Sequence, residues 1–251
     1  MAETAAKALS LGERIKETLA FKTMFTIHIG DVSIPISETV VTCWLVMAIL
    51  IIGSILLTRR LKQVPKGPQV FLEAFIGFLN SFFKDTIGHN WRVFAPYLGT
   101  VALFLGVADM ISFISPMSGF GFEAPFMFKP PTRDINVTAA LAIMTIVIVL
   151  FSNVIFKGFK GWFKSFFEPA PFMLPFNILE YFIKPLSLCL RLFGNILGAF
   201  IIMELLGMFI PLFLPPIFGM YFDFFDGLVQ AVVFTFLSTL YISEAAETHK
   251  E

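Results

Sequence analysis

The chain has 251 residues, of which 57% are hydrophobic, 16% aromatic and only 14% charged. Its mean hydropathy is +0.83, whereas roughly a quarter of the residues in a soluble domain are charged. The 18 basic and 18 acidic residues balance, so no excess of positive charge points to nucleic acid as a partner. A chain this apolar is not intrinsically disordered. The composition predicts an integral membrane protein whose surroundings are a lipid bilayer.

Five stretches of the chain are long and apolar enough to cross a membrane, which requires about 20 residues. We therefore expect an all-α membrane protein with about five embedded helices. The last two are longer than a hydrocarbon layer of about 30 Å requires, which predicts that both are strongly tilted. The expected spans are 39–58, 93–116, 135–156, 174–210 and 219–246.

Two further segments have the pattern of membrane-surface helices. Residues 68–86 carry a row of phenylalanines and a leucine on one helical face and polar side chains on the other, which predicts an amphipathic helix on the cytoplasmic surface. Residues 157–169 alternate lysines with aromatic side chains, a pattern typical of an anchor at the membrane interface. Residues 1–38 have no signal-peptide pattern. We divide the chain into an extracytoplasmic tail, 1–38, and one membrane domain, 39–251.

The positions of Lys and Arg predict the orientation, because cytoplasmic loops carry the excess of these residues. Five spans place the two termini on opposite sides of the membrane. With the N-terminus outside, the inner segments hold Arg59, Arg60, Lys62, Lys66, Lys84, Arg92, Lys157, Lys160, Lys164, Lys184 and Lys250. The outer segments hold Lys7, Arg14, Lys16, Lys22, Lys129 and Arg133. This asymmetry favours an outer N-terminus and a cytoplasmic C-terminus.

Arg191 is the most informative charge inside an apolar stretch. It stays protonated at working pH, and a charge at the bilayer centre costs roughly 2.5–3.5 kcal/mol on insertion scales, so it marks a function by default. One alternative is an arginine that reaches back to the interface, since Lys184 lies only seven residues earlier. Gly194 and Gly198 on the same side of the helix fit close packing of another helix.

The last predicted helix carries a second polar row, in which Asp226 and Gln230 are neighbours at i,i+4 spacing. Asp223 and Asp226 lie near its outer end, and acids at a helix start beside the positive end of the helix dipole are an alternative explanation for them. Asp109 and Glu204 lie within two other spans, where each is expected to face protein or water and not lipid.

The chain has no phosphate-binding glycine loop, no metal-ligand spacing and no nucleophile elbow, so we expect no catalytic site, no metal and no cofactor. Two classes of function are compatible with the polar groups. One is an ion path that works against a carboxylate of a partner protein. The other is a self-contained secondary ion transporter. Transporters usually have internal repeats and broken helices, and this sequence has no repeat, which favours the first class.

The run Lys184-Pro-Leu-Ser-Leu-Cys-Leu-Arg191-Leu-Phe-Gly-Asn195 resembles the signature of subunit a of F-type ATP synthase, the stator subunit of the membrane sector Fo. The last helix, from Gln230 to Tyr241, is similar to the C-terminal helix of that subunit. Residues 131–138 are similar to its entry into the third span. The resemblance covers roughly residues 38–248.

The resemblance implies a membrane protein that forms two aqueous half-channels against a rotating ring of c subunits, held by b-type peripheral stalk subunits within the whole complex. It implies that Arg191 is the essential arginine, Asn195 its polar neighbour and Gln230 the glutamine of the last helix. Asp109 aligns with an acid near the outer access path. The expected coupling ion is the proton or sodium, and the expected location is a bacterial plasma membrane.

The sequence departs from well-known bacterial relatives at two positions that vary together in the family. Those relatives carry an acid nine residues after the arginine, where this chain has Phe200. They often carry a histidine seven residues before the glutamine, where this chain has Asp223. We expect Asp223 to serve the outer half-channel, either alone or with the help of Glu204 or Asp226.

Overall fold

The structure, a computed structural model, describes residues 23–29, 32–59, 61–114, 130–167, 171–209, 218–219 and 221–246. Outside the described residues lie the first part of the predicted tail, the ends of the spans predicted at 93–116 and 174–210, residue 220 of the last span and the C-terminal residues. The division into tail and membrane domain stays a prediction.

The described part of the predicted tail contains a β-hairpin that the sequence analysis missed. Strand β1, Thr23–Ile29, pairs antiparallel with strand β2, Val32–Ser37. β-Branched residues such as Ile27 and Ile34, which face each other across the pair, favour extended backbone. The hairpin leads directly into helix α2, Glu38–Thr58, so it lies at the N-terminal end of the first span.

Helices make up most of the remaining described residues. After α2 come α3, Pro68–Ile87; η1, Gly88–Asn90; α4, Trp91–Ile114; η2, Pro131–Arg133; α5, Ile135–Ser165; η3, Pro171–Met173; α6, Leu174–Phe209; η4, Tyr221–Asp226; and α8, Gly227–Ala246. Five helical stretches are long and apolar enough to cross a membrane: Glu38–Thr58, Pro68–Ile111, Ile135–Ser165, Leu174–Met203 and Phe224–Ala246. This confirms the predicted fold class, an all-α integral membrane protein.

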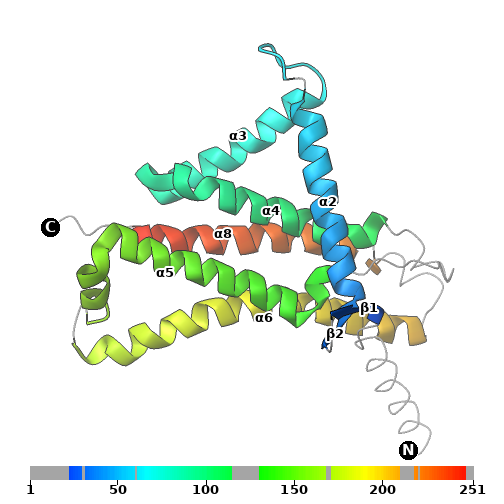
Figure 1. The fold of residues 1–251 in the computed structure, drawn as a ribbon. Helices are drawn as coiled ribbons and strands as arrows, with labels where there is room; N and C mark the ends of the chain where they lie inside the picture. Colours follow the sequence, from blue (N-terminus) through cyan, green and yellow to red (C-terminus); the bar gives the residue numbers. More distant parts are fainter. Residues whose placement is uncertain are drawn as a thin grey trace, which may run out of the picture.

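A sharp bend separates the predicted amphipathic helix from the span that follows it. Helix α3 ends at Gly88, whose φ of 76° is a conformation that favours glycine, and Figure 1 shows the chain turning back there into α4. The first half of α3 leaves Phe71 and Phe78 exposed, whereas Phe83 and Ile87 near its end are buried. Only the end of α3 therefore packs into the core.

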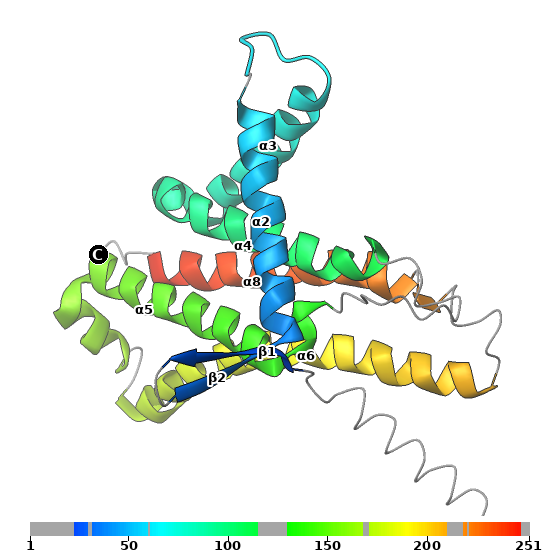
Figure 2. The same cartoon turned by 45° about the vertical axis from the view of Figure 1, so that its right-hand side comes forward.

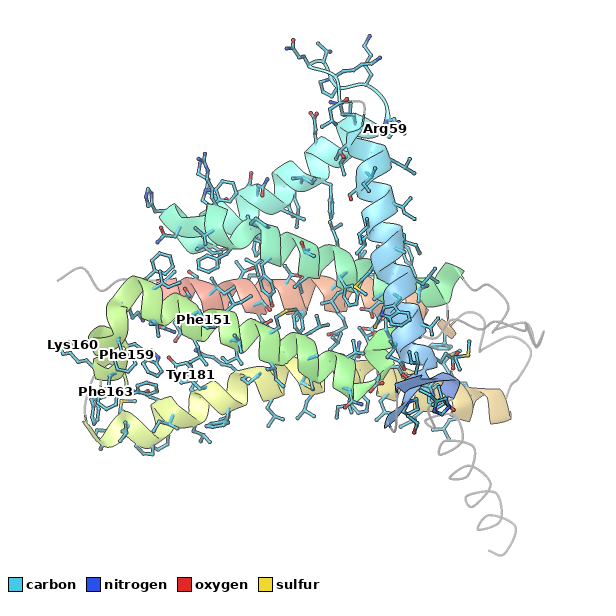
Figure 3. The ribbon with its side chains drawn as sticks, in the orientation of Figure 1. Arg59, Phe151, Phe159, Lys160, Phe163 and Tyr181 are labelled. Carbon is cyan, nitrogen blue, oxygen red and sulfur yellow. The ribbon has the colours of Figure 1, made fainter. Side chains whose placement is uncertain are left out.

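Helix α5 continues nine residues beyond the predicted end of its span at residue 156 and reaches Ser165. It does so across a kink at Gly158, where φ is 70°. The segment beyond the kink is the predicted aromatic and basic anchor. Figure 3 shows Phe159, Lys160 and Phe163 there, beside Tyr181 of α6. The first part of α5 therefore ends at this kink, close to the predicted end of the span at residue 156.

The core lies between α4, α8 and α5. Helix α8 packs against both α4 and α5, and α5 packs against α6. Figures 1 and 2 show these four helices side by side, with α2 crossing them. With 36 residues, α6 is about 54 Å long at 1.5 Å per residue, which supports the expectation of a tilted helix. The last span does not begin as an α-helix, because Tyr221–Asp226 form a π-helix.

Candidate functional site

Arg191 lies on the outward face of α6. Its neighbours Leu188, Cys189 and Leu192 are buried against the other helices, whereas Arg191 and Leu190 are exposed. Among the described residues, Lys184 forms ion pairs with Glu180 and Glu244, and in that part of the chain no ion pair involves Arg191. A fixed positive charge on an apolar helix face is costly in lipid, and no ion pair among the described residues offsets that of Arg191.

Asn195 lies one turn after Arg191 and connects α6 to the start of α8. Its Nδ2 donates a hydrogen bond to Oδ2 of Asp226, the last residue of η4. Asp226 is half-buried. The predicted residues Asn195 and Asp226, which belong to different spans, are therefore in direct contact.

Asp109 lies near the end of α4 and is only 4% exposed. The hydroxyl of Thr132 in η2 donates a hydrogen bond of 2.5 Å to its Oδ1, while its Oδ2 has no hydrogen-bond partner among the described residues. Gly227, the residue after Asp226, lies so close that a Cβ added to it would be 2.8 Å from Cβ of Asp109. Asp226 is near enough for its charge to act on Asp109.

Three predicted residues, Asp109, Asn195 and Asp226, thus come together where α4, η2, α6 and α8 meet. We call these three residues with Thr132 the outer polar cluster. Gln230 lies one turn after Asp226 on α8 and is half-buried. Glu204 and Asp223 belong to α6 and η4, but their side chains lie outside what the structure describes.

Sequence reasoning missed Thr132 and the contact of Arg133 with Phe200. Thr132 is fully buried, yet an isolated threonine before a span carries no pattern that predicts a carboxylate partner. The guanidinium carbon of Arg133 lies 4.3 Å from the centre of the Phe200 ring. In the sequence, Arg133 contributes only to the charge asymmetry, and Phe200 is only a departure from the family pattern.

Later residues of the polar row on the last helix belong to the core. Thr235 and Ser238 are 4% and 0% exposed. The hydroxyl of Thr235 donates to the backbone oxygen of Ala231 within the same helix, at 2.8 Å. These two side chains contribute to packing between helices, so the polar row does not continue as an open surface along α8.

A second polar contact joins α6 to the C-terminal end of α8. Lys184 Nζ lies 2.9 Å from Glu180 Oε1 on its own helix and 2.8 Å from Glu244 Oε2 on α8. It also lies 5.2 Å from the centre of the Tyr241 ring. The two helices are therefore tied by polar groups on either side of Arg191.

A bundle of membrane-length helices, with an arginine on its outer face and buried carboxylates nearby, is typical of membrane proteins that move ions. The family model described as ATP synthase A chain matches residues 40–243, and the chain belongs to this family. Proteins of this family are part of the ion-translocating membrane sector of ATP synthase and not of its catalytic part.

Two relatives match most of the chain. The chain is 38% identical to ATP synthase subunit a of Moorella thermoacetica over 223 residues, which cover 88% of this chain and 95% of that protein. It is 36% identical over 219 residues to a protein of Propionigenium modestum named ATP synthase subunit a, sodium ion specific. That match covers 85% of this chain and 75% of the relative.

Proposed function

We propose that this chain is the stator subunit through which protons or sodium ions cross the membrane sector of an F-type ATP synthase. Two aqueous half-channels lead to a rotating ring of c subunits, and Arg191 separates them. The observation that carries this proposal is the exposed position of Arg191, on a face of α6 where the described residues offer it no carboxylate.

The role of Arg191 follows from its fixed charge. A carboxylate of the ring must be neutral or ion-loaded while it faces lipid, because an isolated charge there is costly. Beside Arg191 the ionised form is stabilised by the opposite charge. The ring carboxylate therefore releases its ion at Arg191, and the same positive charge prevents an ion from passing directly between the half-channels.

The outer polar cluster, with Gln230 beyond it, is the proposed end of the outer half-channel. It brings a buried carboxylate, a half-buried carboxylate and an amide together beside Arg191. Asp223 and Glu204 are proposed to extend this path. A chain of such groups provides the polar partners that an ion needs in place of bulk water.

The proposed orientation has an outer N-terminus and a cytoplasmic C-terminus in a bacterial plasma membrane. Figure 3 shows Arg59 and Lys160 at helix ends remote from the hairpin β1–β2, in line with the distribution of Lys and Arg. The proposed partners are the c-subunit ring, b-type peripheral stalk subunits and the rest of the complex.

The decisive experiment replaces Arg191 by Ala and by Lys. Both variants should assemble, and both should lose ATP synthesis in reconstituted vesicles under an imposed potential. Ala lacks the charge, while Lys is a compact ammonium that cannot present the planar fork of arginine. Subunit levels are measured in the same samples. Near-normal synthesis by the Lys variant would refute the role of Arg191. Ion uptake by the chain alone, without c subunits, would favour the self-contained transporter.

A further inference from the structure

We infer that Arg133 and Phe200 form a latch that fixes the rotation of α6 about its axis and so keeps Arg191 turned outward. This inference deepens the proposed function and rests on it. The latch consists of the guanidinium of Arg133 over the Phe200 ring, with 4.3 Å between the guanidinium carbon and the ring centre. Arg133 is a positioning residue in this arrangement, because it acts on Arg191 only through α6.

Phe200 belongs to the packed face of α6. The residues Cys189, Leu192, Ile196 and Phe200 are spaced at i, i+3, i+7 and i+11, so they lie on one side of a helix with 3.6 residues per turn. Cys189 and Leu192 are buried, and Ile196 packs against the same core. At Phe200 the contact on this side comes from a cation of η2.

Arg191 lies on the opposite side of the helix. It precedes Phe200 by nine residues, or about 2.5 turns, so the two side chains point in opposite directions. Beyond Ile196, the α6 side chains that the structure describes are half-buried or exposed, and none is fully buried. A contact behind the helix at Phe200 is therefore well placed to set the direction of Arg191.

The segment that supplies the cation is itself firmly held. η2 contacts α2, α4, α5 and α6, and its Pro131 and Thr132 are buried. Asp134, which follows η2, caps α5 by accepting a hydrogen bond from the backbone N–H of Asn136 at 2.9 Å. Since Thr132 also binds Asp109, one short turn aligns the acid of α4 with the arginine face of α6.

The latch also explains the departure from the family pattern at position 200. An aromatic ring attracts a cation through the negative charge density of its face. The ring of Phe200 thus attracts the guanidinium of Arg133 although position 200 itself carries no acid. The outer polar cluster then depends on Asp109 and Asp226, not on a carboxylate at position 200.

Fluorination of the Phe200 ring tests the latch specifically. Phenylalanines with one, two and three ring fluorines keep nearly the same shape, but each fluorine weakens the attraction of the ring face for a cation. ATP synthesis in reconstituted vesicles should fall stepwise, to a rate about two- to tenfold lower for the trifluorinated ring, as the usual strength of one such contact implies. The same series at Phe182, an exposed ring on α6, should have no effect.

Variants of Arg133 identify the cation. In Arg133→Lys the fluorine series should still lower the rate, whereas in Arg133→Met it should have no effect, because the pair acts as a unit. Assembly is checked by subunit levels. If Arg133→Met fails to assemble, the test is made with fluorinated Phe200 and fluorinated Phe182 in the native chain and in the Arg133→Lys variant. A Phe200 series with no effect in the native background would overturn the latch.

The outcome for Arg191 separates this inference from the proposed function. If Arg191→Ala abolishes synthesis while fluorination of Phe200 changes nothing, the latch is wrong and the proposed function stands. If Arg191→Ala synthesises ATP normally, the proposed function is wrong, and the latch loses the role argued for it.

Discussion

The side-chain amide of Asn195 donates a hydrogen bond to the carboxylate of Asp226, and this bond joins α6 to the start of α8. Asn195 follows Arg191 by one helical turn, so the bond brings a carboxylate of the last span close to the arginine. The described residues show no ion pair between Asp226 and Arg191. Asp226 is thus held near the proposed release point while the charge of Arg191 stays available to the ring.

We expect Asp226→Asn to slow ATP-driven ion pumping by roughly tenfold, because a hydrogen bond to a charged group contributes on the order of 1 kcal/mol more than one to a neutral group. Asn at this position still accepts a hydrogen bond from Asn195 but carries no charge. Pumping is measured in reconstituted vesicles. Asp223→Asn is the companion variant. If only Asp223→Asn is impaired, the outer half-channel runs one turn further out. If neither is impaired, both acids serve only the helix start.

Gly227→Ala should destabilise the protein by about 1–3 kcal/mol, the usual cost of overpacking. The added Cβ would lie 2.8 Å from Cβ of Asp109 and 3.8 Å from its Cα, so α4 and α8 would have to separate at the outer polar cluster. Pumping should fall with stability. Gly106→Ala on α4 is the matched control, since nothing lies within 4 Å of its added Cβ. Equal thermal stability of the two variants would contradict this close approach.

The fold class could be predicted because it depends on the lengths of apolar runs. The span predicted at 174–210 corresponds to α6, Leu174–Phe209, since a mostly apolar sequence of this length has few alternatives to a helix in lipid. The hairpin β1–β2 was missed because its strands are short and lie in a polar tail. The kink at Gly158 and the π-helix of η4 were missed because hydropathy does not detect local changes of backbone geometry.

The candidate site was predictable only in part, for a similar reason. Arg191, Asp109 and Asp226 stand out because each is a charge in apolar surroundings. Thr132 and Arg133 do not, because they precede a span and contact residues far away in the sequence. The partners of Thr132 and Arg133 depend on how η2 packs between the helices. Periodicity within one segment of the sequence does not predict such packing. The assignment of roles to the site residues stays a prediction that the proposed variants test.

The proposed orientation predicts which side of the membrane each loop faces. In a variant without Cys43 and Cys189, single cysteines at Lys62 and Lys160 should react with a membrane-impermeant maleimide only from the cytoplasmic side. A cysteine at His28, which is exposed in the hairpin, should react only from outside. Labelling is compared in right-side-out and inverted vesicles. Reaction of the Lys62 position from outside would reverse the orientation.

The contacts of Lys184 predict an asymmetry between its partners. Its side chain is 14% exposed and lies between Glu180 and Glu244, whose side chains are 50% and 60% exposed. Glu244→Gln removes one well-solvated partner and leaves the pair with Glu180, so it should cost at most about 1 kcal/mol. Lys184→Met removes the shared cation and leaves two carboxylates without it, so it should be clearly more destabilising. The double variant should then be more stable than Lys184→Met alone, because the repulsion between the carboxylates is gone.

Thermal unfolding in detergent measures the stability of each variant at low and at high salt. High salt should reduce the differences in stability between the variants, because it screens the charges. Strictly additive effects of the two substitutions would mean that Lys184 and Glu244 do not act on each other across α6 and α8.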